Sequence, residues 1–372
     1  MARTQQRRHL APLLISILLL LAFLIHTPTG LANSSFSKQK QVVETGNITN
    51  LTPPEGARHI KFGIQILDID NLSVNDMTFL ATGWYWLKWD QSIQDLLERD
   101  HLKIEDVVKP LNLIEPWFSK FEPSKEGVKR QNENEYYQLF SFSGTFFFNE
   151  LNQDRAPFIK VWAPIDFEIE PSNYAIGKPD QIFLVPDDDS NSQVLGSYGD
   201  ISGFQNQSAS IGSYTHEYPN NFGLGDRPSS YAGIQLDMIY SVAFWTGFVE
   251  FLLPMLLVFL LLISSPFSDP RETDFRLSTP ATAILTFIFL QSFTNDRFPP
   301  TPELSYMDQL FAYCYIAAIA IFGLFMWSSS KLNQHPDDDK TESIKKIRKV
   351  ERIVQVSCIA GMALVAIAEW TA

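Results

Sequence analysis

The chain has 372 residues, 45% of them hydrophobic, and a formal net charge of −13. The whole acidic excess lies between residues 33 and 238, where 16 Lys and Arg stand against 29 Asp and Glu, so the basic footprint that nucleic-acid binding requires is absent. Both cysteines, Cys314 and Cys358, lie in apolar runs, which excludes a disulfide-stapled fold or thiol catalysis in the acidic region.

Residues 1–32 have the three parts of a secretory signal peptide. ARTQQRRH is basic, LAPLLISILLLLAFLI is apolar, and GLA before Asn33 offers a small-residue cleavage site. An uncleaved signal anchor is the alternative, and either would export the region that follows. Residues 33–57 are largely polar, so we expect a partly flexible N-terminal segment.

Residues 58–238 carry the pattern of an all-β sandwich. One short helix is expected within QSIQDLLERDHLKIEDVV. Elsewhere, short runs of alternating apolar and polar residues are separated by Asn, Asp, Gly, Pro and Ser clusters, which is typical of a sandwich or barrel. The runs are HIKFGIQILDI, MTFLATGWYWLKW, YYQLFSFSGTFFF, IDFEIE, QIFLV and YAGIQLDMIY.

The remaining residues predict four transmembrane helices. A helix that crosses a bilayer needs about 20 mostly apolar residues. The first three helices are expected within residues 239–330 and the fourth within 351–372, with a short loop at 331–350. The candidate segments are Val242–Ile263, Thr273–Phe298, Leu310–Trp327 and Ile353–Trp370.

Basic residues in the connections predict the orientation. The connection between the third and fourth segments holds seven Lys and Arg, whereas the connection between the second and third holds only Arg297. The basic connection should therefore be cytoplasmic. This places the β-rich region outside a plasma or inner membrane, in agreement with the signal peptide.

The second segment carries a polar stripe. Its residues are separated by four, three, four, three and four positions, which puts them on one helix face. Ser and Thr in membrane helices often pack against neighbouring helices, and off the stripe we expect this of Thr279, Thr286 and Gln291. The alternative is that the stripe faces water. Its members are Ser278, Thr282, Leu285, Phe289, Ser292 and Asp296.

Acidic residues at both ends of this segment favour the second interpretation. Asp274 and Asp296 are 22 residues apart, or about 33 Å along a helix. Acidic rings at the mouths and an apolar constriction between them are features of a cation pore. One helix cannot enclose a pore, so several copies would have to surround it.

The order of these elements resembles the prokaryotic branch of the pentameric ligand-gated ion channels, the Cys-loop receptor superfamily. The resemblance covers roughly residues 58–370. FLLPMLLVFLLL carries the proline of the first helix, FPPTPELSYMD leads into the third, and FLATGWYWLKWD is similar to the second strand. An acid and an arginine, Asp274 and Arg276, precede the pore helix, and Leu285 occupies the expected gate position.

The resemblance implies a homopentamer around a central pore that conducts monovalent cations across the lipid bilayer. Leu285 and Phe289 would form apolar gate rings, and Asp274 and Asp296 would favour cations. Arg276 would point away from the axis. A small-molecule agonist, an amine or a proton, would bind between subunits. The aromatic candidates for that site, which also suit ordinary core packing, are Trp117, Tyr174, Tyr214, His216, Tyr218 and Phe222.

Residues expected to couple the two domains depart from the family pattern. Pro157, Phe158, Pro299 and Asp308 match it, but Ile159 replaces an acid and an arginine is missing near Ser241. Ser278-Thr279-Pro280 predicts a cap and a helix start, which would leave the chain around Asp274 outside the helix.

Glu250, within the first apolar segment, has two interpretations. An acid in a membrane helix usually faces protein or water. It would either bond to a neighbouring helix or act as a proton sensor.

The sequence does not predict an enzyme. It contains no GxSxG, Gly-rich phosphate loop or HExxH motif, and no zinc spacing. We therefore expect no catalytic residues, cofactor or metal site. A non-conducting membrane sensor that keeps the channel fold remains the alternative.

Overall fold

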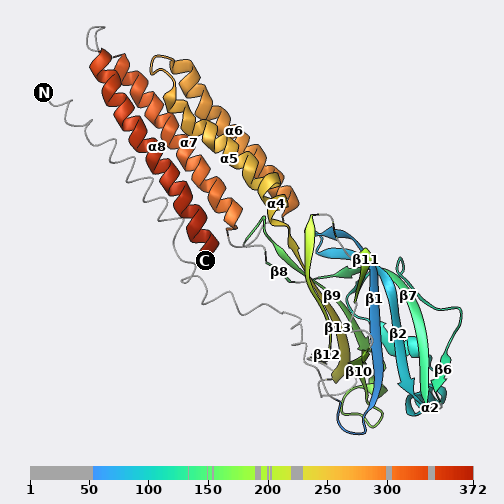
Figure 1. The fold of residues 1–372 in the computed structure, drawn as a ribbon. Helices are drawn as coiled ribbons and strands as arrows, with labels where there is room; N and C mark the ends of the chain where they lie inside the picture. Colours follow the sequence, from blue (N-terminus) through green and yellow to red (C-terminus); the bar gives the residue numbers. More distant parts are fainter. Residues whose placement is uncertain are drawn as a thin grey trace. The chain divides into compact units, whose positions relative to one another are not determined.

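The fold was analysed in a computed structural model. It describes residues 53–371 apart from 133, 149, 153–154, 189–193, 199–200, 202, 219–228, 299–303 and 334–339. The predicted signal peptide (1–32) and most of the segment 33–57 lie outside the described residues. The chain divides into a β-rich unit, Gln39–Leu151 with Lys160–Ala243, and a helical unit that contains Phe244–Ala372 and Asn152–Ile159 (Figure 1).

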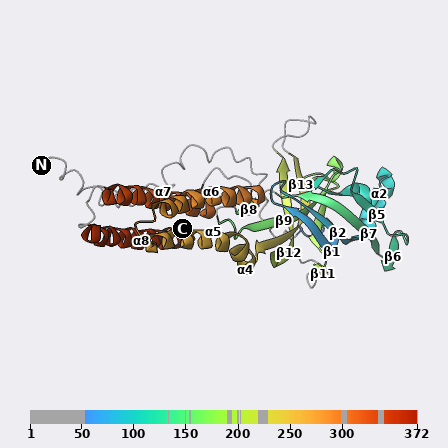
Figure 2. The same ribbon diagram turned by 90° about the horizontal axis from the view of Figure 1, so that it is seen from above.

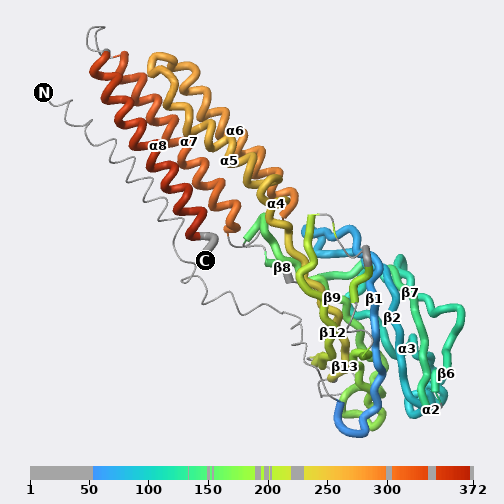
Figure 3. The backbone as a smooth tube through the Cα atoms, viewed as in Figure 1, coloured from blue at the N-terminus to red at the C-terminus, as the bar shows by residue number. Residues whose placement is uncertain are grey.

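The β-rich unit contains two sheets. The larger has the strand order β10-β1-β2-β7-β4, with β11 beside β1 and with β5 and β6 beside β7. Figure 3 traces β1, β2 and β7 as neighbouring strands, which pair antiparallel. These strands are β1 (Arg58–Ser73), β2 (Thr78–Asp90), β4 (Leu113–Ile114), β5 (Lys120–Pro123), β6 (Lys129–Asn132), β7 (Glu135–Phe147), β10 (Ile182–Pro186) and β11 (Leu195–Tyr198).

The smaller sheet has the order β12-β13-β9-β3, with β8 beside β9. Its central pairings are antiparallel, with Gln235 opposite Asp166 and Gly233 opposite both Glu168 and Tyr214. The strands are β3 (Val108–Pro110), β8 (Glu150–Asn152), β9 (Lys160–Ile169), β12 (Phe204–Tyr218) and β13 (Ser229–Val242).

Aromatic residues from both sheets form the core between them. Burial alternates along β2 and β7, as the period of two along a strand requires. Phe167 of the smaller sheet lies 4.8 Å from Phe62 and 5.1 Å from Tyr85 of the larger sheet, measured between ring centroids. The predicted sandwich-like architecture is thus confirmed.

The predicted short helix is also present, as α2 (Gln91–Asp100) followed by α3 (Ile104–Val107). Asp90 ends β2 and caps α2, because its side chain accepts a hydrogen bond from the Ile93 N–H at 3.0 Å. Ile93, Leu96 and Leu97 are the buried face of α2.

Among the described residues, the helical unit has four helices long and apolar enough to cross a membrane. Figures 1 and 2 show α5, α6, α7 and α8 running alongside one another. The first span consists of α4 (Phe244–Gly247), a π-helical turn (Phe248–Leu252), α5 (Leu253–Ser264) and a 3₁₀ turn (Ser265–Phe267). The other three are α6 (Thr273–Arg297), α7 (Tyr306–Leu332) and α8 (Lys340–Thr371).

Pro254 explains the wide turn in the first span. Proline has no N–H to donate to the carbonyl four residues earlier, here that of Glu250. The helix adopts a π turn instead, in which the N–H of Leu253 bonds to the carbonyl of Phe248. Glu250 therefore lies in a locally widened part of the helix.

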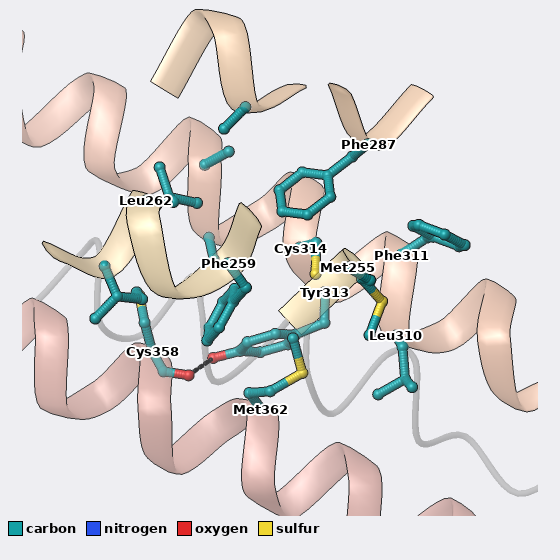
Figure 4. Packing of buried hydrophobic residues seen from close by; sticks show 14 of the residues in the cluster. Met255, Phe259, Leu262, Phe287, Leu310, Phe311, Tyr313, Cys314, Cys358 and Met362 are labelled. Carbon is teal, nitrogen blue, oxygen red and sulfur yellow. Dashed lines mark hydrogen bonds between the residues drawn. The ribbon is translucent and has the colours of Figure 1, made fainter. Parts of the chain in front are cut away.

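The core of the helical unit is apolar and contains both cysteines. Figure 4 shows Met255 and Phe259 of α5 packed with residues of α7 and α8. Within this core the Tyr313 hydroxyl donates to the carbonyl of Cys358 at 3.0 Å, which satisfies it on a neighbouring helix.

The start predicted for the second membrane helix, α6, is wrong. α6 begins at Thr273, so Asp274 lies in its first turn and Pro280 lies inside the helix. The hydroxyls of Ser278 and Thr279 both donate to the carbonyl of Phe275, at 3.0 and 2.8 Å. The Ser-Thr-Pro sequence looks like a cap, but here its hydroxyls bond back into a helix that continues through it.

Candidate functional site

α6 has one face packed in the helical unit and an opposite face left open. Its buried residues are Arg276, Pro280, Ala283, Phe287 and Thr294, which recur at helical spacing. Phe287 packs edge-to-face on Tyr315 of α7, with ring centroids 6.2 Å apart.

The predicted stripe lies on the open face. Leu285 and Phe289 are 53% and 66% exposed, far above the usual value for core residues. In the most apolar 18-residue stretch of each helix, only 22% of α6 is buried, against 56% of α7. Within one chain the stripe therefore turns away from the chain's own helices. Asp274, which precedes the stripe, is exposed, and so are all six members: Ser278, Thr282, Leu285, Phe289, Ser292 and Asp296.

The polar residues of α6 that lie off the stripe form hydrogen bonds within the helical unit. Gln291 accepts a hydrogen bond from the Tyr315 hydroxyl of α7 at 2.8 Å, as expected for a residue that packs on a neighbouring helix. Thr279 and Thr286 instead bond to carbonyls of their own helix. Contact with a neighbouring helix was expected of all three residues. These hydrogen bonds bear it out for Gln291 but not for Thr279 or Thr286.

Glu250 has an ionic partner on α6. Its Oε1 lies 3.5 Å from Nη2 of Arg297, and the Arg297 guanidinium also lies over the Phe293 ring at 5.5 Å. The contact fits the expectation that Glu250 meets a neighbouring helix. Its role as a proton sensor stays a prediction.

A second candidate site lies on the face of the smaller sheet that points away from the core. We call it the acid–tyrosine cluster: Asp166, Glu168, Tyr214, His216, Tyr218, Tyr231 and Gln235. Because side chains alternate along strands, these positions of β9, β12 and β13 share one face, opposite core residues such as Phe167.

Glu168 is the centre of the cluster's hydrogen bonds. It is only 7% exposed. His216 Nδ1 lies 2.8 Å from its Oε2, and the Tyr218 hydroxyl donates to its Oε1 at 2.9 Å. The His216 and Tyr218 rings are 4.0 Å apart between centroids, and Tyr231 meets Tyr218 edge-to-face. The predicted residues Tyr214, His216 and Tyr218 are thus brought together around an acid.

Gly233 leaves room for Tyr214. A Cβ at position 233 would lie 2.3 Å from Cζ of Tyr214, so the tyrosine ring lies directly over the glycine. Tyr214 is 6% exposed, and its hydroxyl has no hydrogen-bond partner among the described residues. Burial and the negative charges of Asp166 and Glu168 raise the pKa of Tyr214.

Asp166 is the second enclosed acid of the cluster. The residue keeps some exposed surface, but its Oδ1 is enclosed and has no hydrogen-bond partner among the described residues. Burial raises the pKa of Asp166 to about 7; Asp237 and Glu168 also raise it, while Gln235 and His216 act in the opposite direction. Asp166 therefore titrates near neutral pH.

The other predicted ligand candidates lie elsewhere. Tyr174 is fully buried and its hydroxyl donates to Asp100 at 2.8 Å, so it has a packing role in this chain. Trp117 is 76% exposed and contacts Phe118, between β4 and β5 of the larger sheet. Phe222 lies outside the described residues.

The residues predicted to couple the two domains lie in different parts of the chain. Pro157 is buried, in a loop that belongs to the helical unit, and the neighbouring Phe158 stacks on Phe244. Asp308 and Ser305 form a capping box at the start of α7, with Asp308 accepting from the Ser305 N–H at 3.1 Å. Pro299 lies outside the described residues.

Sequence reasoning missed Asp166 and Glu168. The alternating acids of IDFEIE were a signal, since such residues share one sheet face. Among the described residues, no group of three or more His, Cys, Asp or Glu is arranged to hold a metal ion. The candidate functional features are the exposed α6 stripe and the largely buried acid–tyrosine cluster.

Searches of protein-family models and of curated proteins found nothing that matches this chain.

Proposed function

We propose that the chain is a subunit of a homopentameric, cation-selective channel of the ligand-gated type. The observation that carries the proposal is the open face of α6, which combines hydroxyls, two large apolar residues and an acid near each end. Other copies of the chain would cover this face, and the stripe would line the water-filled path between them.

The apolar residues of the stripe supply the gate. Rings of Leu285 and Phe289 would empty of water when the helices approach one another, and would fill when they separate. Asp274 and Asp296 would concentrate cations at the two mouths. The β-rich unit would lie outside the cell and the basic first turns of α8, which the sequence had placed in a loop at 331–350, would lie inside.

The acid–tyrosine cluster would receive the activating ligand. Three tyrosines and two acids suit a proton or a small ammonium compound, because acids and aromatic faces both attract positive charge. The unsatisfied Tyr214 hydroxyl and Asp166 Oδ1 are groups that such a ligand would satisfy. Glu250 is the second candidate for proton binding.

The experiment is electrical recording from purified full-length protein in planar bilayers, over a range of pH and a panel of amines. Discrete current steps with a reversal potential near the cation equilibrium value are expected. Ligand binding without current would favour a non-conducting sensor, and neither binding nor current would reject the proposal.

A further inference from the structure

Arg276 is the buried cation of α6. It is 2% exposed although it lies two residues after Asp274, which is exposed. Residues two apart on a helix point roughly 200° apart. Arg276 therefore points into the helical unit, away from the open stripe.

Three contacts from the neighbouring helices hold the guanidinium. It forms an ion pair with Glu351 of α8, which is itself 2% exposed. It donates from Nη1 to the Ser328 hydroxyl of α7 at 3.1 Å, and it lies over the Phe325 ring at 4.2 Å. Glu351 supplies the opposite charge in this group.

The pair is not optimised for stability. Arg276 Nε and Glu351 Oε2 are both enclosed and have no hydrogen-bond partner among the described residues. A buried ion pair loses the hydration of both charges and is a net gain only when its remaining polar atoms are satisfied. A role other than stabilisation would account for its presence beside the proposed mouth.

We propose that Glu351 sets the charge selectivity of the pore by holding Arg276 away from it. This inference rests on the proposed channel function. Without the Glu351 charge, the guanidinium would be an uncompensated ion in an apolar core, and a long arginine side chain can turn toward water instead. The water nearest to it would be that of the mouth, where its charge would cancel the field of Asp274.

Glu351 is thus a positioning residue on α8, a helix that does not itself line the proposed pore. Glu351 acts only through the charge of Arg276. Removing both charges should therefore restore the ion selectivity that removing Glu351 alone disturbs. An ion pair that only joins α6 to α8 would affect stability and expression but would leave ion selectivity unchanged. Ion selectivity therefore separates the two roles.

The test measures the cation-to-anion permeability ratio from reversal potentials in salt gradients, for wild type, Glu351→Gln, Arg276→Gln and the double variant. Glu351→Gln should lower the ratio several-fold. Arg276→Gln and the double variant should keep the wild-type ratio, because the mouth then still carries only Asp274. Glu342→Gln, an exposed α8 acid that pairs with Lys346, is the matched control and should change nothing.

An unchanged ratio in Glu351→Gln would overturn the inference. If Glu351→Gln does not assemble, Glu351→Asp, whose shorter side chain weakens the hold on the guanidinium, takes its place: a lower ratio supports the inference, and the wild-type ratio contradicts it. Absence of current from the wild type would instead reject the channel proposal itself.

Discussion

The ring of Phe158 stacks on the ring of Phe244, with centroids 5.2 Å apart and planes inclined by 11°. Phe158 belongs to the loop that groups with the helical unit, and Phe244 begins the first span. The adjacent Ile159, which departs from the acid of the family that the sequence resembles, is fully buried. An aromatic contact therefore joins this loop to the first span.

In the proposed channel, Phe158→Ala should weaken activation. An aromatic pair contributes about 1 kcal/mol beyond the area it buries, so the activating concentration should rise roughly fivefold if the stack forms in the open state only. Phe158→Tyr keeps the ring and should behave like the wild type. Concentration–response curves of the three proteins provide the measurement, and identical curves would show that activation does not use the stack.

Gly233→Ala should disturb the acid–tyrosine cluster, because the new Cβ would meet the Tyr214 ring. Overpacking of this kind costs about 1–3 kcal/mol. In a Tyr214→Ala background the same change should cost much less, because the obstructing ring is gone. Thermal unfolding of the purified full-length variants measures this coupling. Equal costs in the two backgrounds would contradict the placement of Tyr214 over Gly233.

Asp166 should make the stability of the protein depend on pH. Its pKa of about 7 in the fold lies above its ordinary value of 3.8, so the folded state binds more protons between these two pH values. Stability should therefore fall as pH rises from about 4 to about 7, by roughly 1–3 kcal/mol. Asp166→Asn cannot titrate and should flatten this part of the curve.

Unfolding midpoints recorded from pH 4 to 8 provide the test for Asp166. Asp188→Asn, a change to an acid of the same β-rich unit, serves as the control and should keep the slope of the wild type. A slope in Asp166→Asn as steep as that of the wild type would assign the pH dependence to other groups.

Glu250→Gln tests the proposed proton sensor in the first span. The substitution removes the charge that faces Arg297. If Glu250 senses protons, the pH of half-maximal current should shift in this variant, and Arg297→Gln should shift it as well by removing the ionic partner. A pH response that is unchanged in Glu250→Gln would remove Glu250 from consideration and leave Asp166 as the candidate.

The sequence predicts the larger features of this fold because they depend on local patterns. Alternation along β2 and β7 and the length of the apolar segments are visible without any tertiary contact. The spacing of Ser278, Thr282 and Leu285 likewise places them on one helix face. The start of α6 was predicted wrongly because Ser-Thr-Pro has the composition of a cap, although packing allows the helix to continue through it.

The polar clusters depend on contacts between distant parts of the chain and could not be predicted. Glu168 meets His216 and Tyr218, which follow it by 48 and 50 residues. Glu351 lies 75 residues from Arg276, directly after a basic stretch whose charges give no sign of that pairing. Residue type alone does not indicate which partner a buried charge finds.

Cysteine modification of α6 tests most directly whether its open face lines a water-filled pore. Thr282→Cys lies on that face, and Ala283→Cys, its buried neighbour, is the matched control. Cys314 and Cys358 are both buried, so the background reaction should be low. A charged, membrane-impermeant thiol reagent should irreversibly reduce the current of Thr282→Cys and leave that of Ala283→Cys unchanged. Current through Thr282→Cys that the reagent does not affect, or equal block of both variants, would contradict the account.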